Sequence, residues 1–207
     1  MLDYELPIFE KGYKYIVGCD EAGRGPLCGP VVCAACILPQ GYHDEMINDS
    51  KKLTDKKRRI LFEKIKNDAI AYAIIAIDPE TIDRINIYES SRKGMTDAIK
   101  ALKVKPDYII TDCMPLLEFK DTPIEPIVKG DAKAMCVAAA SILAKVTRDN
   151  IMEEIDKKYP QYEFKKHKGY PTKLHLELLK KYGPIKGLYR YSYRPVKEVS
   201  EEQLTLF

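Results

Sequence analysis

Long hydrophobic segments are missing from this chain of 207 residues. The longest unbroken apolar run, Ala69–Ile77, has nine residues, whereas a membrane-spanning helix needs about 20. Residues 1–14 contain no apolar core flanked by basic residues, so no secretory signal is visible. Tryptophan, internal repeats and low-complexity segments are absent as well. We therefore expect a soluble, cytoplasmic protein that does not associate with membranes.

Paired cysteine motifs are also scarce, which argues against a zinc site. The sequence has six cysteines, but only Cys33 and Cys36 form a CxxC, and no second CxxC accompanies it. Both lie in an apolar run that predicts a β-strand, where a spacing of three places them on opposite faces. They cannot then bind one ion together, so we expect buried free thiols in a reducing compartment.

A large excess of one charge sign is missing too. Lys and Arg number 34, Asp and Glu number 31, and the net charge of +3 is too small to indicate a partner. The basic residues are concentrated in residues 51–59 and 165–168, whereas residues 198–202 are acidic. Hydrophobic residues make up 45%, which lets a chain of this length bury the core of one ordinary domain.

Hydrophobic periodicity predicts both strands and helices. Strands are expected at 15–19, 31–38, 69–77, 108–111 and 124–128. Helices are expected from the N-cap Thr54 to about Asn67, in a short segment after Pro79, at 88–102, from about Ala132 to Lys158, and at 172–182. Three strands come first and two then alternate with helices, which indicates an antiparallel meander followed by parallel additions. After Pro160 the composition changes and predicts a small helical extension.

Four acidic residues lie at the ends of these predicted elements. Asp20 and Glu21 follow the first strand, Asp112 follows the fourth, and Asp131 precedes the long helix. If the first and fourth strands are neighbours, these carboxylates meet at one sheet edge and repel one another unless cations lie between them. Carboxylate oxygens suit Mg²⁺, and two such ions can promote phosphodiester cleavage. Each acid alone is more typical of a turn or a helix cap, so spacing by itself supports only a candidate metal site.

A resemblance to a known family adds to this pattern. The segment Gly18–Val32 contains an acidic pair followed by Ala-Gly-Arg-Gly-Pro, and it closely resembles the signature of the type 2 ribonuclease H family. The resemblance covers about residues 15–195 and continues, in the same order, at Asp49–Leu53, Thr111–Asp112, Lys129–Lys133, Ala138–Asp149 and His167–Tyr170, with Thr172, Lys173 and His175 after them.

The resemblance implies an α/β protein with a ribonuclease-H-like fold. Such a fold has a five-stranded mixed sheet flanked by helices, here with a C-terminal helical extension. We accordingly expect a catalytic domain at residues 1–158 and an extension that contributes to substrate binding at 159–197. A flexible tail is expected at 198–207.

The resemblance implies an endoribonuclease that is expected to hydrolyse the RNA strand of RNA–DNA hybrids by two-metal-ion catalysis. It is also expected to cut on the 5′ side of ribonucleotides embedded in duplex DNA, leaving 3′-hydroxyl and 5′-phosphate ends. This activity would serve ribonucleotide removal from DNA and RNA-primer removal. The implied catalytic residues and metal ligands are Asp20, Glu21, Asp112 and Asp131, with Mg²⁺ or Mn²⁺ as the cofactor.

The same resemblance implies a substrate-binding surface around the acids. The Gly23-Arg24-Gly25 turn is implied to contact the ribonucleotide, since glycines let backbone groups approach a sugar and the 2′-hydroxyl distinguishes RNA from DNA. Tyr170 is implied to hydrogen-bond near that hydroxyl and to stack on the following sugar. Without the resemblance, it would be a surface tyrosine in a Gly-Tyr-Pro turn. Phosphate contacts are expected from Lys51, Lys145, Arg148 and Lys168.

Two segments depart from the family pattern. Pro171 stands where a small residue is more usual, which would stiffen the turn that presents Tyr170. Residues 189–193 are unusually rich in tyrosine. Neither departure touches the acidic residues.

Other functions fit the sequence less well. The nearest alternative is a type 3 ribonuclease H, which acts on longer hybrids, usually has an extra N-terminal domain and lacks Gly-Arg-Gly. A hydrolase that forms an aspartyl-phosphate would need a second acid at the position of Ala22. In a non-catalytic nucleic-acid-binding module, four carboxylates facing phosphates would be costly without a cation.

The last five residues resemble the pentapeptide by which bacterial replication proteins dock on the sliding clamp. Leu206 and Phe207 would enter an apolar pocket, with Gln203 hydrogen-bonded at its rim. The alternative is a C-terminal stretch that packs on its own domain. We therefore expect two kinds of partner: RNA–DNA hybrid or ribonucleotide-containing duplex DNA, and a clamp bound through Gln203, Leu204, Leu206 and Phe207.

Overall fold

Five strands form one mixed sheet in the order β3-β2-β1-β4-β5. The computed structural model describes residues 4–47 and 53–204, with side chains up to residue 201. β1 pairs antiparallel with β2, and β2 with β3, whereas β4 is parallel to both β1 and β5. The predicted antiparallel meander with parallel additions is therefore confirmed. The strands are β1 (Ile16–Ala22), β2 (Val31–Ile37), β3 (Ala71–Ile77), β4 (Tyr108–Asp112) and β5 (Ile124–Ile127).

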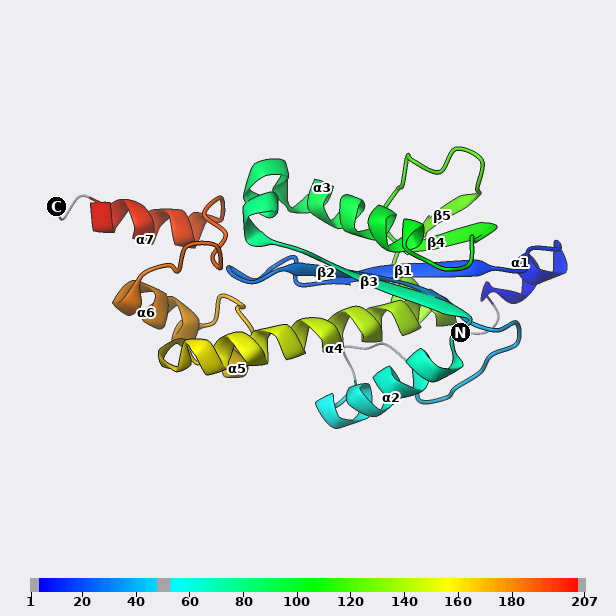
Figure 1. The fold of residues 1–207 in the computed structure, drawn as a ribbon, viewed down its shortest axis with the longest axis horizontal. Helices are drawn as coiled ribbons and strands as arrows, with labels where there is room; N and C mark the ends of the chain where they lie inside the picture. The colour runs from blue at the N-terminus through cyan, green and yellow to red at the C-terminus, as the bar shows by residue number, and fades with distance from the viewer. Residues whose placement is uncertain (1–3, 48–52, 205–207) are drawn as a thin grey trace.

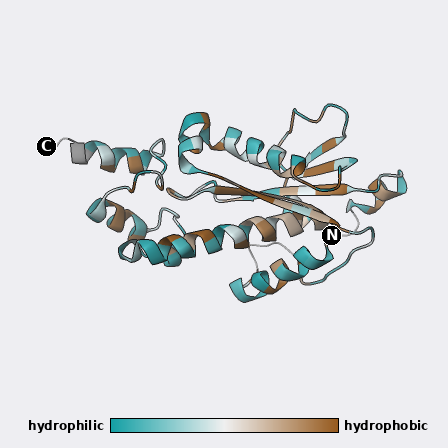
Figure 2. Cartoon of the chain, viewed as in Figure 1, coloured by the Kyte–Doolittle hydropathy of each residue, from teal (hydrophilic) through white to brown (hydrophobic). Residues whose placement is uncertain are grey.

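Helices cover both faces of this sheet (Figure 1). α3 lies on one face, α4 and α2 lie on the other, and α5, α6 and α7 form an extension beyond one end of the sheet. Figure 2 shows that the central strands are largely apolar, whereas the helices carry many polar residues. The helices are α1 (Leu6–Glu10), α2 (Asp55–Asp68), α3 (Pro79–Lys100), α4 (Met135–Lys158), α5 (Phe164–His167), α6 (Lys173–Tyr182) and α7 (Arg194–Leu204), with 3₁₀ turns η2 (Gly130–Ala132) and η3 (Pro160–Tyr162).

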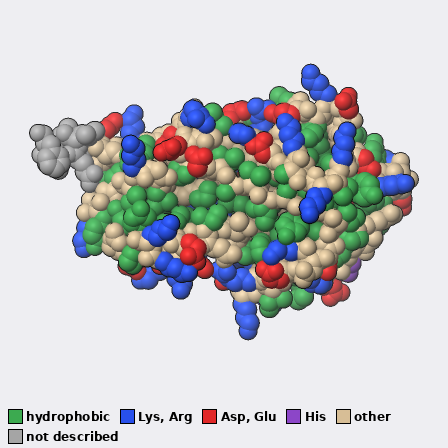
Figure 3. All heavy atoms as spheres, viewed as in Figure 1, with side chains coloured by type: hydrophobic (Ala, Val, Ile, Leu, Met, Phe, Trp, Pro, Cys, Tyr) green, Lys and Arg blue, Asp and Glu red, His purple; other side chains and the backbone are tan. Residues whose placement is uncertain are grey.

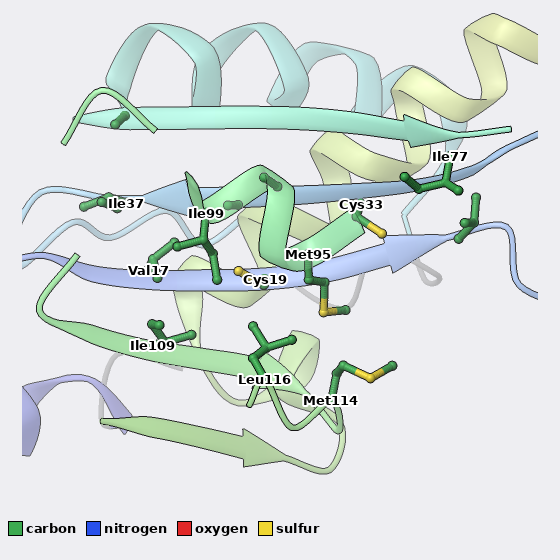
Figure 4. Packing of buried hydrophobic residues seen from close by; sticks show 14 of the residues in the cluster. Val17, Cys19, Cys33, Ile37, Ile77, Met95, Ile99, Ile109, Met114 and Leu116 are labelled. Carbon is green, nitrogen blue, oxygen red and sulfur yellow. The ribbon is translucent and has the colours of Figure 1, made fainter. Parts of the chain in front are cut away.

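The core is divided by the sheet into two layers. All seven residues of β2 are buried, and they alternate between the layers because successive side chains of a strand point to opposite faces. Cys33 packs with Met95 of α3, as Figure 4 shows, whereas Cys36 packs in the cluster under α4 and α2. Both thiols are free, and burial raises their pKa. The prediction of buried free thiols on opposite faces is confirmed for this pair.

Most predicted helix boundaries are close to the observed ones. Thr54 caps α2, its hydroxyl accepting a hydrogen bond from Lys57 N at 3.4 Å. The two helices predicted after Pro79 and at 88–102 form the single element α3, which Asn86 interrupts with a φ of 65°. The long helix α4 begins a few residues after the predicted start, because η2 precedes it.

The C-terminal part contains more helix than the sequence indicates. α7 crosses the boundary that was predicted between residues 197 and 198, so the described part of the predicted tail is helical. Val196 and Val199 of α7 pack in one cluster with Leu27 and with Met152 of α4, which ties the C-terminal helices to the rest of the structure. Across the described ranges, every helix is too short or too polar to span a bilayer.

α4 packs on β1 at very short range. A Cβ on Gly18 of β1 would overlap the backbone of Cys136 and Val137, so this contact requires glycine. Residues 138–140, all alanine, and Ser141 are buried and extend the contact with small side chains. The close approach places Ser141 beside the carboxyl end of β1.

The first turn of α4 is held by a residue from near the N-terminus. Glu5, which directly precedes α1, is buried, and its carboxylate accepts hydrogen bonds from Met135 N (3.2 Å) and Cys136 N (2.8 Å). The first N–H groups of a helix lack intrahelical acceptors, and the helix dipole favours negative charge there. Glu5 therefore caps α4 across a sequence separation of 130 residues.

Replacing Glu5 by alanine should lower the free energy of unfolding by about 1–3 kcal/mol, because two buried N–H groups lose their acceptor. Urea denaturation measures this change. Glu10→Ala, at the exposed end of α1, is the matched control and should change the stability by less than about 0.5 kcal/mol. Equal effects of the two substitutions would show that the Glu5 carboxylate does not support α4.

Candidate active site

One cavity gathers most of the residues that the sequence singles out. Its volume is about 270 Å³, and it opens at the carboxyl ends of β1 and β4. The remaining lining comes from α4, the turn after β1 and the C-terminal extension, so segments distant in sequence contribute to one site. The lining residues are Asp20, Glu21, Ala22, Gly23, Arg24, Gly25, Asp112, Ser141, Lys145 and Tyr170.

The register of the sheet brings two of the acids together. β1 and β4 are parallel neighbours, with Cys19 opposite Thr111. Asp20 and Asp112 are the next residues along each strand, so both lie at the same edge of the sheet. The expectation that the first and fourth strands are neighbours is therefore correct.

This arrangement affects the ionisation of Asp20. It is 5% exposed, and burial raises the pKa of its carboxyl well above the ordinary value. The negative charges of Glu21 and Asp112 raise this pKa further, whereas hydrogen bonds from Ser141 and from Glu21 N (2.7 Å) lower it. A cation bound in the cavity would favour the ionised form, because it would offset both the desolvation and the repulsion.

Asp131 does not line the cavity. It lies in η2 and is 3% exposed, and its neighbour Gly130 donates its backbone N–H to Asp112 Oδ1 at 2.9 Å. Three of the four predicted acids thus share the cavity, and the fourth belongs to the turn that holds Asp112. Within residues 4–47 and 53–204, no three His, Cys, Asp or Glu side chains form a complete metal site. Oxygen donors in a partial set still suit Mg²⁺, which usually keeps several waters.

The Gly23-Arg24-Gly25 turn and Tyr170 lie close together in the cavity wall. Gly23 has a φ of +101°, and a Cβ there would overlap the Arg148 side chain, so this position requires glycine. A Cβ on Gly25 would lie 3.7 Å from Tyr170 Cε1. Tyr170 is 41% exposed, which leaves its ring available to a ligand. A sugar in this cavity would meet backbone groups of the turn and an aromatic ring.

A model of the ribonuclease HII family matches residues 17–196, which include every residue that lines the cavity. The chain belongs to the ribonuclease HII family. It is therefore a ribonuclease H, a hydrolase that acts on RNA–DNA hybrids. Enzymes of this family depend on divalent metal ions. This membership decides against the type 3 enzyme and against a non-catalytic binding module.

Relatives of known name cover nearly the whole chain. The chain is 49% identical to ribonuclease HII of Acholeplasma laidlawii (strain PG-8A) over 201 residues, which are 97% of this chain and 98% of that protein. Its fold resembles that of ribonuclease H2 from Pyrococcus horikoshii OT3, with a TM-score of 0.77, 28% identity, and coverage of 91% of this chain and 98% of that one. It also resembles ribonuclease HII of Archaeoglobus fulgidus, solved in complex with PCNA, with a TM-score of 0.73, 27% identity, and coverage of 87% and 95%. The predicted ribonuclease-H-like fold is thus confirmed.

Two of the four predicted phosphate-binding residues are lysines with described side chains. Lys145 lines the cavity and pairs with Asp149 at 2.7 Å. Lys168 pairs with Glu153, also at 2.7 Å, and its side chain is 19% exposed. Lys51 lies outside the described residues. Figure 3 shows basic and acidic side chains interspersed on the face in view, in agreement with the small net charge.

Arg148, the fourth predicted phosphate contact, has a different place in the structure. Its side chain is completely buried, and its guanidinium donates hydrogen bonds to the carbonyls of Pro30 (3.1 Å), Cys28 (3.3 Å) and Lys168 (3.0 Å). The guanidinium carbon also lies 5.8 Å from the centre of the Tyr170 ring. The predicted phosphate contact is corrected accordingly, because a guanidinium without exposed surface cannot reach a bound phosphate. Arg148 instead holds the main chain beside the cavity.

Tyr170 is supported through its main chain by a buried histidine pair. His175 Nδ1 lies 2.9 Å from Tyr170 O, and because a carbonyl only accepts, this nitrogen carries the proton. Nε2 then accepts from the Tyr189 hydroxyl at 2.8 Å. The ring stacks on His167 with a centroid distance of 4.1 Å. Burial, together with the neighbouring His167, lowers the pKa of His175 to about 4.

Ser141 is a functional residue that the sequence analysis does not single out. Its hydrogen bond to Asp20 and its place in the cavity lining show that it orients the buried acid. The available signal was a hydroxyl that follows three alanines near the start of the long helix.

Because the histidine pair is buried, we expect the protein to lose stability in mild acid. The pKa of His175 is lower in the folded state than the ordinary 6.5. The contribution of the neutral ring to the free energy of unfolding is therefore complete above about pH 6.5. It is lost as the pH falls toward about 4, by up to about 3 kcal/mol. The free energy of unfolding, measured from pH 7 to 4.5, should fall less steeply in His175→Gln than in the wild type. His43→Gln, at an exposed position, should keep the wild-type slope. Equal slopes in all three proteins would contradict this assignment.

Proposed function

We propose that this chain cuts on the 5′ side of ribonucleotides embedded in duplex DNA, besides hydrolysing the RNA strand of hybrids. Water attacks the phosphodiester, and the products carry 3′-hydroxyl and 5′-phosphate ends. The observation that carries the proposal is the single cavity shared by three carboxylates and a glycine turn suited to contact a ribose. The activity would remove ribonucleotides and RNA primers from DNA.

Asp20, Glu21 and Asp112 would hold Mg²⁺ or Mn²⁺ in this proposal, and Asp131 would complete or tune the site. The donors fit such ions, since all three are carboxylates lining one cavity and the Asp20 carboxyl is disfavoured as an anion without a cation. Two bound ions would supply an activated water and stabilisation of the leaving oxygen. The chain itself orients the donors: Ser141 bonds to Asp20, and Gly130 N to Asp112.

Recognition of the ribonucleotide is assigned to the Gly23-Arg24-Gly25 turn and Tyr170. The turn exposes backbone groups where glycine leaves room for a sugar, and the 2′-hydroxyl can both donate to and accept from them. The ring of Tyr170, 41% exposed beside Gly25, is placed to stack on the following sugar. Lys145 in the cavity lining would contact phosphate, and Lys51 and Lys168 are kept as further phosphate contacts.

The Asp20→Asn substitution should reduce cleavage of a duplex with one ribonucleotide by about 100-fold or more at saturating Mg²⁺, because it removes a charge that the metal requires. Binding of that duplex should persist. Asp121→Asn, at an exposed position that is not part of the cavity lining, is the matched control and should cleave like the wild type. The measurement is single-turnover cleavage followed on denaturing gels, with product ends identified. Rapid cleavage by Asp20→Asn would refute the metal-site assignment, and cleavage elsewhere than 5′ of the ribonucleotide would refute the proposed specificity.

A sliding clamp is proposed as a second partner, bound through the C-terminal residues. The PCNA complex of the Archaeoglobus fulgidus protein supports an interaction of this general kind. Gln203 and Leu204 form the end of α7, and Leu206 and Phe207 lie outside the described residues. In Figure 1 α7 projects at the end of the molecule opposite α1, so a partner there would not cover the sheet.

Deleting residues 203–207 should abolish pull-down by a bacterial sliding clamp and leave cleavage of short duplexes unchanged, because the motif is separate from the cavity lining. The Leu206→Ala, Phe207→Ala double variant should behave in the same way, since it removes the two apolar anchors. Thr205→Ala is the control within the motif and should still bind. Undiminished pull-down of the deletion variant would exclude this mode of docking.

A further inference from the structure

Arg190, which follows α6, reaches across to the glycine turn. Its side chain is completely buried, and all five of its N–H groups have acceptors. Four of the bonds go to backbone carbonyls in or just after the turn: Gly23 O (2.7 Å), Arg24 O (3.0 Å) and Gly29 O (2.8 and 3.1 Å). The fifth goes to the Tyr193 hydroxyl at 3.0 Å.

Tyr193 makes a second, independent contact with the same turn. Its hydroxyl donates to Arg24 O at 2.6 Å while it accepts from Arg190. The guanidinium carbon of Arg190 lies 5.2 Å from the centre of its ring, close enough for a cation–π contact. The carbonyl of Arg24 is therefore held from two directions by one segment of the C-terminal extension.

This segment is itself anchored to the catalytic domain. Asp83 of α3 accepts hydrogen bonds from Tyr191 N (2.8 Å), Ser192 N (2.9 Å) and Ser192 Oγ (2.6 Å), which fixes the short turn between Arg190 and Tyr193. On its other side, Arg190 N donates to Leu27 O at 2.9 Å. The two side chains therefore extend from a rigid base.

The turn depends on such outside support for a physical reason. Gly23 and Gly25 have no side chains that could fix their conformation, and glycine has access to more backbone conformations than any other residue. The φ of +101° at Gly23 is one of several that glycine can adopt. The planar fork of a guanidinium can hold several carbonyls in one fixed geometry, which a lysine ammonium on a flexible stem cannot do.

We propose that Arg190 and Tyr193 are positioning residues that hold the Gly23-Arg24-Gly25 turn in its ribose-reading geometry. The C-terminal extension would thereby set the preference of the enzyme for a ribonucleotide over a deoxyribonucleotide. This inference rests on the proposed role of the turn and adds the side chains that maintain it. Neither residue lines the cavity, so neither is assigned a contact with substrate.

The test is the Tyr193→Phe variant, which removes one hydroxyl and keeps the ring. Its dissociation constants are measured, without added divalent metal, for a duplex with one ribonucleotide and for an all-DNA duplex of the same sequence. The ratio of the two constants, which measures ribose selectivity, should fall about fivefold, the effect of one lost hydrogen bond. Cleavage of the ribonucleotide duplex should slow as well, and the melting temperature should stay close to that of the wild type.

Tyr191→Phe is the matched control, because it makes the same chemical change two residues away. The Tyr191 hydroxyl contacts Pro184 O at 3.4 Å and is not bonded to the turn. This variant should keep the wild-type selectivity ratio and cleavage rate. Arg190→Lys keeps the charge but loses the fork, so its selectivity should fall further than that of Tyr193→Phe.

The outcomes separate this inference from the proposed function. If wild-type protein cleaves beside the ribonucleotide but Tyr193→Phe keeps the full selectivity ratio, the positioning role is overturned and the function stands. Equal weakening of binding to both duplexes would also overturn it, because a general structural defect does not distinguish the sugars. If the wild type binds both duplexes equally well, the proposed recognition of the ribose by the glycine turn is refuted, and with it the positioning role. Should Arg190→Lys fail to fold, Tyr193→Phe alone decides.

Discussion

The contact between α4 and β1 at Gly18 is the constraint on which the rest of the structure depends. Because the helix backbone lies directly on the strand, only glycine and small residues fit there. The same contact brings Ser141 to Asp20, and η2, just before the helix, brings Gly130 to Asp112. Glu5, near the N-terminus, fixes the start of the helix. The packing of α4 on β1 therefore holds the acids close together. Contacts outside the cavity, such as those of Glu5, stabilise this packing.

The glycine turn depends on a second constraint, which α4 and the C-terminal extension supply together. Two buried guanidinium groups, of Arg148 and Arg190, bind carbonyls of residues 23–30. Buried polar groups need such partners, and the carbonyls of a glycine-rich segment offer them without side-chain obstruction. His175 extends the support to the main chain of Tyr170. The extension is thus part of the site, although none of its residues other than Tyr170 lines the cavity.

Sequence patterns predicted the strands and most helices because local periodicity determines which faces are buried. The order of parallel and antiparallel pairs also followed, since short connections favour antiparallel neighbours and helical crossovers favour parallel ones. α7 was missed because its apolar positions are few and its sequence is acidic. Arg148 was assigned to phosphate because composition does not distinguish a buried arginine bonded to carbonyls from an exposed one. Arg190 gave no signal of its own, and Ser141 only that of a hydroxyl after three alanines.

The sequence by itself determined the family and singled out the four acids and the glycine turn as candidate site residues, because these are matters of residue type and order. Only the tertiary structure decided that three acids share a cavity while Asp131 lies in the adjoining turn. It alone decided that Arg190 meets Gly23 over a separation of 167 residues. The physical reason is that hydrogen bonds and burial depend on which distant segments pack together. Periodicity reports which face of an element is buried, but not which residue lies opposite it.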